Sequence, residues 1–122
     1  MKTGTGGQLR FRKSEIDVLR YLTRFGSTHK QGLRKYLGLG YATIHEAVGH
    51  LEEGGMIKTV KEEKWRTGLI KRTYDITLVG LISVLALNEV WWDSQEIIEI
   101  VRRRSDMLPL IFGKWDYFRK RD

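Results

Sequence analysis

The sequence predicts a mainly α-helical fold with a small β-hairpin and a C-terminal helical extension. Apolar residues recur at spacings of three and four over residues 14–53, which is the period of amphipathic helices. Gly54 and Gly55 end that pattern, and two strand-like runs then flank a turn glycine, Gly68. From Thr77 onward the helical period returns and is much more apolar. These three observations order the elements as helices, a hairpin and further helices.

The first two helices are predicted from capping residues and apolar spacing. Ser14 can cap the free amides of a helix that ends before Gly26. Ser27 or Thr28 is expected to cap a second helix, which reaches about residue 37. The apolar residues that place both helices against a core are Ile16, Leu19, Leu22, Phe25, Leu33, Tyr36 and Leu37.

A third helix is predicted over residues 41–53, between a glycine turn and the Gly54-Gly55 pair. Ile44, Val48 and Leu51 recur at i, i+4 and i+7, so they face inward. Residues 56–65 and 69–76 read as two strands of a hairpin, which carries six basic and two acidic residues over positions 58–72. This excess of cations on an exposed hairpin is typical of a surface that contacts a polyanion.

The C-terminal third is predicted to form helices, the first of which needs either a partner chain or the rest of the C-terminal segment to cover it. Thr77 is expected to cap a helix over residues 78–91, and its apolar residues leave almost no polar face, which predicts burial. Ser94 is expected to cap a fifth helix, with Ile97, Ile98, Ile100 and Val101 on one side and a solvated end at residues 102–104. A last helix is expected from about Ser105 and Pro109. We expect a homodimer, with Leu78, Leu81, Ile82 and Leu85 at its interface.

Composition excludes several classes of protein. There is no cysteine among the 122 residues, which excludes disulfides, thiolate metal sites and a cysteine nucleophile. The three histidines lack an acidic residue at metal-ligand spacing, and no catalytic triad or phosphate-binding loop is found, so we expect no metal, no cofactor and no enzyme. The longest uncharged run, residues 76–88, is too short to span a bilayer, and the polar N-terminus does not resemble a signal peptide. We therefore expect a cytoplasmic protein.

The net charge of +7 is unevenly placed along the chain. The first 35 residues hold nine Lys and Arg against two acids, whereas the rest of the chain holds 13 of each. A concentrated positive field attracts polyanions, among which nucleic acid is the commonest. The composition, with one Asn, three Gln, no Cys and 30% charged residues, is also typical of a thermophile.

Three short motifs resemble those of winged helix-turn-helix transcriptional regulators of the MarR, PadR and ArsR kind. They are YATI at 41–44, VGHLEEGGMI at 48–57, and YDIT at 74–77 followed by GL at 80–81. The resemblance covers roughly residues 14–82 and implies a DNA-binding domain at 14–77, after a flexible basic arm at 1–13. Residues 78–122 would then be a dimerisation or extension segment.

The resemblance also implies which residues contact double-stranded DNA. The third helix would enter the major groove, while the second helix and the hairpin, or wing, would hold phosphates. The expected contact residues are Lys30, Gln31, Arg34, Lys35, Tyr41, Thr43, His45, Glu46, His50, Lys64, Arg66, Lys71 and Arg72. The sequence allows a small-molecule effector but does not indicate one.

The predicted reading helix departs from the usual pattern because it contains neither Lys nor Arg. Arginine to guanine is the commonest specific contact, so we expect modest sequence specificity or recognition of DNA shape. The same departure motivates an alternative function, a winged-helix module that binds protein within a transcription or chromatin assembly.

Overall fold

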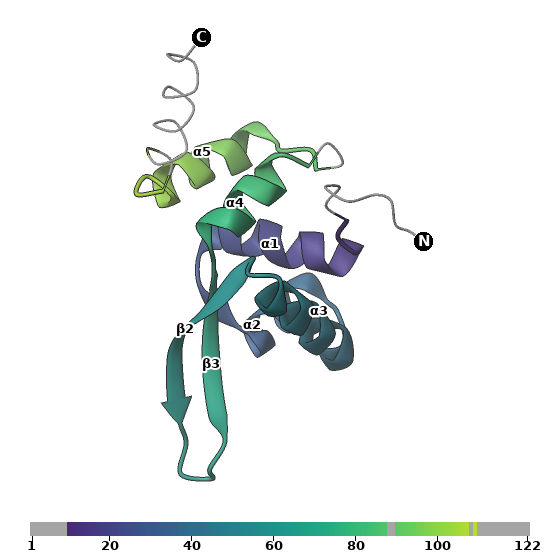
Figure 1. Ribbon diagram of the computed structural model, residues 1–122, viewed down its shortest axis with the longest axis vertical. Helices are drawn as coiled ribbons and strands as arrows, with labels where there is room; N and C mark the ends of the chain where they lie inside the picture. Colours follow the sequence, from purple (N-terminus) through teal and green to yellow (C-terminus); the bar gives the residue numbers. More distant parts are fainter. Residues whose placement is uncertain (1–9, 88–89, 108, 110–122) are drawn as a thin grey trace.

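The computed structural model describes residues 10–87, 90–107 and 109. Within these residues, five helices and three strands follow one another (Figure 1). They are α1 (Lys13–Phe25), β1 (Thr28–His29), α2 (Lys30–Leu37), α3 (Tyr41–Glu53), β2 (Ile57–Lys64), β3 (Ile70–Ile76), α4 (Leu78–Leu85) and α5 (Ser94–Arg103). The mainly helical fold with a small hairpin is therefore confirmed.

The core lies between α1, α2, α3 and the base of the sheet. Leu19, Leu22, Leu33 and Ile44 are completely buried there, because each helix turns the apolar side of its 3.6-residue period inward. The predicted bounds of the third helix agree with those of α3. Gly54 and Gly55 follow it directly, and the positive φ of Gly55 turns the chain into β2.

The sheet has three antiparallel strands in the order β1-β3-β2, so it is larger than the predicted hairpin. The extra strand is β1, whose Thr28 pairs with Tyr74 in β3. β2 and β3 pair from Ile57 opposite Ile76 up to the turn, with an irregularity between Thr59 and Lys61. The hairpin projects beyond the helices as a long arm, on the side of α1 away from α4 and α5 (Figure 1).

Three predicted helix starts are corrected by one residue or more. α1 begins at Lys13 instead of Ser14, and the Glu15 carboxylate accepts the Arg12 backbone N–H at 3.1 Å. The cap of α2 is neither Ser27 nor Thr28, because Thr28 belongs to a strand and the His29 imidazole accepts the Gly32 N–H at 3.0 Å. Asp93 caps α5 in place of Ser94, and its carboxylate accepts the Glu96 N–H at 2.8 Å.

The fourth helix is capped by Thr77 as predicted, but it ends at Leu85 instead of residue 91. Gly80 lets α4 approach the sheet closely, because a Cβ there would lie 2.1 Å from the Met56 carbonyl oxygen. Within its own chain α4 is buried on one side only, so the expectation that a partner chain or the C-terminal segment covers the rest stays a prediction. Leu81 and Val84 are completely buried, whereas Ile82 and Leu85 are exposed.

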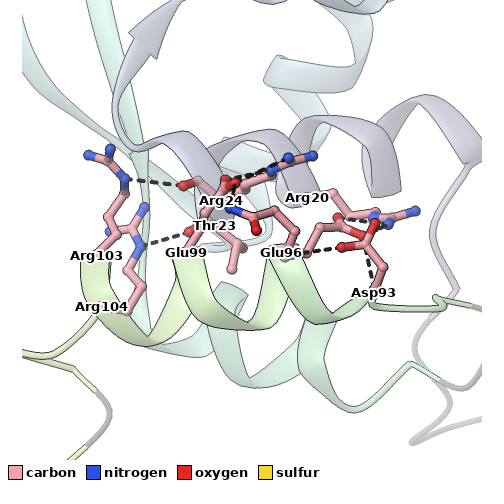
Figure 2. Close-up of polar contacts among 9 residues, drawn as sticks. Arg20, Thr23, Arg24, Asp93, Glu96, Glu99, Arg103 and Arg104 are labelled. Atoms are coloured by element: carbon pink, nitrogen blue, oxygen red, sulfur yellow. Dashed lines mark hydrogen bonds and ion pairs between the residues drawn. The ribbon is translucent and has the colours of Figure 1, made fainter.

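α5 folds back along α1 and is held there by charged side chains (Figure 2). The guanidinium of Arg20 contacts both oxygens of the Glu96 carboxylate at 2.7 and 2.8 Å, and Arg24 contacts Glu99 at 2.7 Å. Arg104, which is 4% exposed, donates to the Asp75 carboxylate of β3 and to the last carbonyls of α1. The expected solvated end at residues 102–104 is therefore wrong for Arg104, which joins α5 to both α1 and the sheet.

The outer side of α5 remains apolar and exposed. Ile100 alone of the four predicted apolar residues is buried, whereas Ile97, Ile98 and Val101 are each at least half exposed. The four residues predicted to share one side of this helix therefore differ in burial. The last predicted helix, over residues 105–122, lies almost wholly outside the described residues. Within the described ranges, no helix is both long and apolar enough to cross a membrane.

Candidate nucleic-acid interface

The predicted contact residues lie on three elements that share one end of the molecule. α2, α3 and the hairpin extend from the side of α1 opposite to α4 and α5 (Figure 1). α3 packs on α1 and α2 through Ile44, Ala47, Val48 and Leu51, which leaves its other side to solvent. The fold thus presents one helix surface beside a projecting hairpin.

The exposed side of α3 is polar and carries neither lysine nor arginine, and three of its ionisable groups have partners, while Glu52 and Glu53 are exposed at its end. Tyr41 is 57% exposed and stacks on the His45 ring, with the ring centroids 5.8 Å apart. Glu46 forms an ion pair with Arg12, and the Nδ1 atom of His50 lies 3.2 Å from the Glu15 carboxylate. Predicted contact residue Thr43 is exposed beside them. The surface therefore offers hydrogen-bonding groups but no unpaired cation of its own.

The cations nearest to α3 come from α2. Gln31, Arg34 and Lys35 are exposed along α2, and neither Arg34 nor Lys35 has an ion-pair partner among the described residues. Lys30 is half-buried, and its Nζ lies 2.8 Å from the His45 Nδ1. Since a lysine ammonium only donates, the imidazole Nδ1 accepts this hydrogen bond.

The hairpin places a second group of cations across a groove from α2. Lys64, Arg66 and Arg72 are exposed, while Lys71 is half-buried. The groove has a volume of about 340 Å³ and combines cations with aromatic and aliphatic side chains. Its lining residues are His29, Lys30, Gln31, Tyr41, Trp65, Leu69, Ile70, Lys71, Arg72 and Tyr74.

The positive charges in this groove are crowded. Burial lowers the pKa of Lys30, and the positive charge of Arg72 lowers it further. Burial and then Lys71 likewise lower the pKa of His29. An anion in the groove would relieve this repulsion, because opposite charge favours the protonated form of each group. The groove is therefore suited to a phosphate group between α2 and the hairpin.

Two arginines that were counted toward the basic N-terminal segment lie away from the candidate interface, and one residue that lies at this interface was missed in the sequence. Arg20 and Arg24, counted within the basic N-terminal segment, are neutralised by α5 on the opposite side of the molecule. Arg12, assigned to a flexible arm, instead borders α3 through its pair with Glu46. A contact between residues 34 positions apart leaves no local signal in the sequence.

The predicted dimer residues differ in exposure. Leu81 is 0% exposed within its own chain, so its assignment to a dimer interface is wrong. Leu78 is half-buried, while Ile82 and Leu85 are 41% and 38% exposed. Val79 on the same helix, at 55%, was not predicted. As for metals, no cluster of three or more His, Asp or Glu residues suited to an ion occurs in the described part of the chain.

Comparison with known proteins gives matches of structure alone. No family model matches the sequence, and no curated protein matches it. The structure is similar to that of a MarR family regulator from Neisseria meningitidis, with a TM-score of 0.52, 21% identity, and 89% of this chain and 68% of that chain covered. It is also similar to Bacillus subtilis PadR in complex with operator DNA, with a TM-score of 0.54, 17% identity, and coverages of 87% and 79%. The chain therefore has the winged helix-turn-helix fold of MarR and PadR regulators.

Proposed function

We propose that the protein binds double-stranded DNA as a dimeric winged-helix transcriptional regulator. The observation that carries this proposal is that α3 packs beside two elements that bear exposed cations, α2 and the hairpin. Arg34 and Lys35 lie on its α2 side, and Lys64, Arg66 and Arg72 lie on the hairpin. Phosphates on both sides of a groove would be held by these cations, while α3 lies in the major groove. The similar PadR structure contains operator DNA, which supports the same use of the fold here.

Salt dependence of DNA binding tests the docking surface. Each lysine or arginine that contacts a phosphate contributes about one unit to the slope of log K against log salt concentration. We expect Arg34→Ala to weaken binding to a random duplex and to reduce that slope by about one. Arg102→Ala is the matched control, because it removes the same exposed charge from the far end of the molecule. Fluorescence anisotropy of a labelled duplex at several salt concentrations measures both variants. Equal effects of the two substitutions would rule out this docking surface.

We further propose that a second copy of the chain covers the exposed apolar residues of α4 and α5. These residues are Val79, Ile82 and Leu85 on α4, and Ile97, Ile98 and Val101 on α5. Burying such residues gains about 25 cal/mol for each Å² of apolar surface, which favours association of two chains. A two-fold dimer would present two α3 helices to a palindromic site.

Light scattering tests the dimer. Ile97→Lys places a charge in the proposed interface and is expected to give a monomer with an unchanged circular dichroism spectrum. Val60→Lys is the matched control, since Val60 is similarly exposed at 47% but lies on the hairpin. An Ile97→Lys protein that keeps the dimer mass would remove this interface from the proposal. A monomeric wild-type protein without DNA affinity would instead favour the alternative, a module that uses the apolar residues to bind another protein.

A further inference from the structure

The start of α1 lies against the outer side of α3, where it supplies the arginine that α3 lacks. Arg12 precedes α1, and its side chain is 62% exposed. Its guanidinium forms an ion pair with Glu46, whose side chain is 54% exposed on α3. Both residues therefore lie at the solvent-facing edge of the proposed reading surface.

A buried carboxylate fixes the position of this pair. Glu15 is only 6% exposed, and it accepts the backbone N–H of Arg12 at 3.1 Å. The same carboxylate receives the Nδ1–H of His50 at 3.2 Å. One buried group thus holds the backbone at Arg12 and the imidazole on α3 in a common arrangement. A carboxylate with two such hydrogen bonds is well suited to restrain both partners.

The side chains around Arg12 form a shallow hollow beside α3. It has a volume of about 240 Å³ and is lined by Arg12, Ser14, Glu15, Thr43, Glu46 and Ala47. Thr43, Glu46 and His50 follow one another at spacings of three and four, so they share the side of α3 that faces the start of α1. A base edge beside this part of α3 would meet Arg12 together with the α3 side chains.

We propose that Arg12 reads guanine and that Glu46 orients it for this role, an inference that rests on the proposed DNA-binding function. A guanidinium has five N–H donors, enough to contact the O6 and N7 atoms of guanine while keeping a hydrogen bond to Glu46. An exposed ion pair contributes little to stability, so Arg12 can adjust toward a base without disturbing the fold. Glu46 in turn loses most of its repulsion toward phosphates because Arg12 neutralises it.

Arg12→Lys separates this role from simple charge. A lysine keeps the positive charge but lacks the two-pronged geometry that recognises O6 and N7 together. Selection from a pool of random duplexes with the wild-type protein is expected to yield a site with a required guanine. Replacing that guanine should reduce wild-type affinity by about 10- to 100-fold, the range of a good bidentate contact. The same replacement should have less than about a threefold effect on the affinity of Arg12→Lys, because the lysine does not distinguish the guanine.

Two further variants complete the test. Arg10→Lys is the matched control, because Arg10 is an exposed arginine of the same segment, and it should keep the full guanine preference. Glu46→Gln removes a negative charge from α3 while freeing Arg12. It is therefore expected to raise affinity for random duplex and to lower the guanine preference. A variant that had merely lost part of its binding surface would instead bind both the random duplex and the guanine-containing site more weakly.

The outcomes distinguish this inference from the proposed function. An Arg12→Lys protein that selects the same site with the same guanine preference would overturn the role of Arg12. A wild-type protein that binds duplex without any guanine preference would also overturn it, while leaving DNA binding itself intact. No binding by the wild-type protein at low salt would refute the proposed function, and the role of Arg12 with it.

Discussion

Replacing Arg104 tests whether α5 is an integral part of the winged-helix domain. The guanidinium is 4% exposed and lies 2.9 and 3.3 Å from the two oxygens of Asp75. It also donates to the carbonyls of Leu22 and Thr23, near the C-terminal end of α1. Arg104→Met keeps much of the side-chain volume but removes every one of these hydrogen bonds. The carboxylate of Asp75 then loses its counter-ion in a partly buried position.

The expected cost follows from the burial of the pair. Removing one partner of a buried ion pair typically costs about 3–5 kcal/mol. The Asp75 side chain is 23% exposed, so water recovers part of that cost. We therefore expect Arg104→Met to lower the free energy of unfolding by about 3 kcal/mol. At roughly 3–4 °C per kcal/mol for a chain of this length, the melting temperature should fall by about 10 °C.

Urea denaturation followed by circular dichroism measures the effect, with Arg102→Met as the control, because Arg102 is exposed at the same end of α5. That control is expected to change stability by less than about 0.5 kcal/mol, as surface substitutions usually do. Combining Arg104→Met with Asp75→Asn should recover at least about 1 kcal/mol, because the unpaired carboxylate is then neutral. If Arg104→Met costs no more than its control, the buried contact between α5, α1 and β3 does not stabilise the fold, and the reasoning fails.

Two further predictions concern a close backbone contact and a titrating helix cap. Gly80→Ala should destabilise the protein by at least about 1–3 kcal/mol, because the new Cβ would overlap the Met56 carbonyl. Gly49→Ala should instead stabilise it by up to about 1 kcal/mol, because Gly49 is helical and has open space around it. Thermal denaturation would contradict this reasoning if both substitutions shifted the melting temperature in the same direction. Burial, and after it the positive charge of Lys71, lowers the pKa of His29. As the pH falls, the unfolded state therefore binds a proton before the folded state does. The free energy of unfolding is then highest above about pH 6.5 and decreases below it. His29→Asn, which keeps a capping acceptor but does not titrate, should therefore lose less stability than the wild type between pH 7 and pH 5, and equal losses would exclude His29 as the source.

The parts of the fold that were predicted correctly have local signals. The third helix was placed correctly because a glycine flanks each end of its apolar period. The hydroxyl of Thr77 accepts the Gly80 N–H at 3.0 Å, a cap that can be recognised within four residues of sequence. The hairpin was similarly marked by Gly68, whose φ of +85° suits the turn.

The parts that were missed depend on contacts between distant segments. β1 is two residues long and exists only because it pairs with β3, more than 40 residues later. That pairing moves the cap of α2 to His29, an unusual capping residue that no propensity would select. The capping box of α5 shows the remaining ambiguity, since Asp93 and Ser94 are both good caps and adjacent.

The apolar residues of α4 and α5 show a different limit of sequence reasoning. Exposing so many apolar side chains to water is unfavourable, so their number indicates that some of them are covered. Periodicity did not assign Leu81 to the core and Ile82 to solvent, because both belong to one uninterrupted apolar run. For α5, the charged residues Glu96 and Arg104 face inward, and Ile97, Ile98 and Val101 face outward. This reversal arises because Arg20, Arg24 and Asp75 give the inward charges partners, which a hydrophobic pattern cannot reveal.

The distribution of charge over the folded surface sets a limit on how the protein can bind DNA. Counting basic residues along the chain placed the whole excess before residue 36, yet Arg20 and Arg24 are used to hold α5. The predicted cations of α2 and the hairpin are seven in number: Lys30, Arg34, Lys35, Lys64, Arg66, Lys71 and Arg72. If each neutralises one phosphate, the slope of log K against log salt concentration reaches about −6 per chain. Since Arg72 also pairs with Glu62 and Lys30 contacts His45, a shallower slope is expected. In the proposed function, attraction to DNA would therefore come from α2 and the hairpin, and sequence preference would depend on hydrogen bonds from α3 side chains and from Arg12.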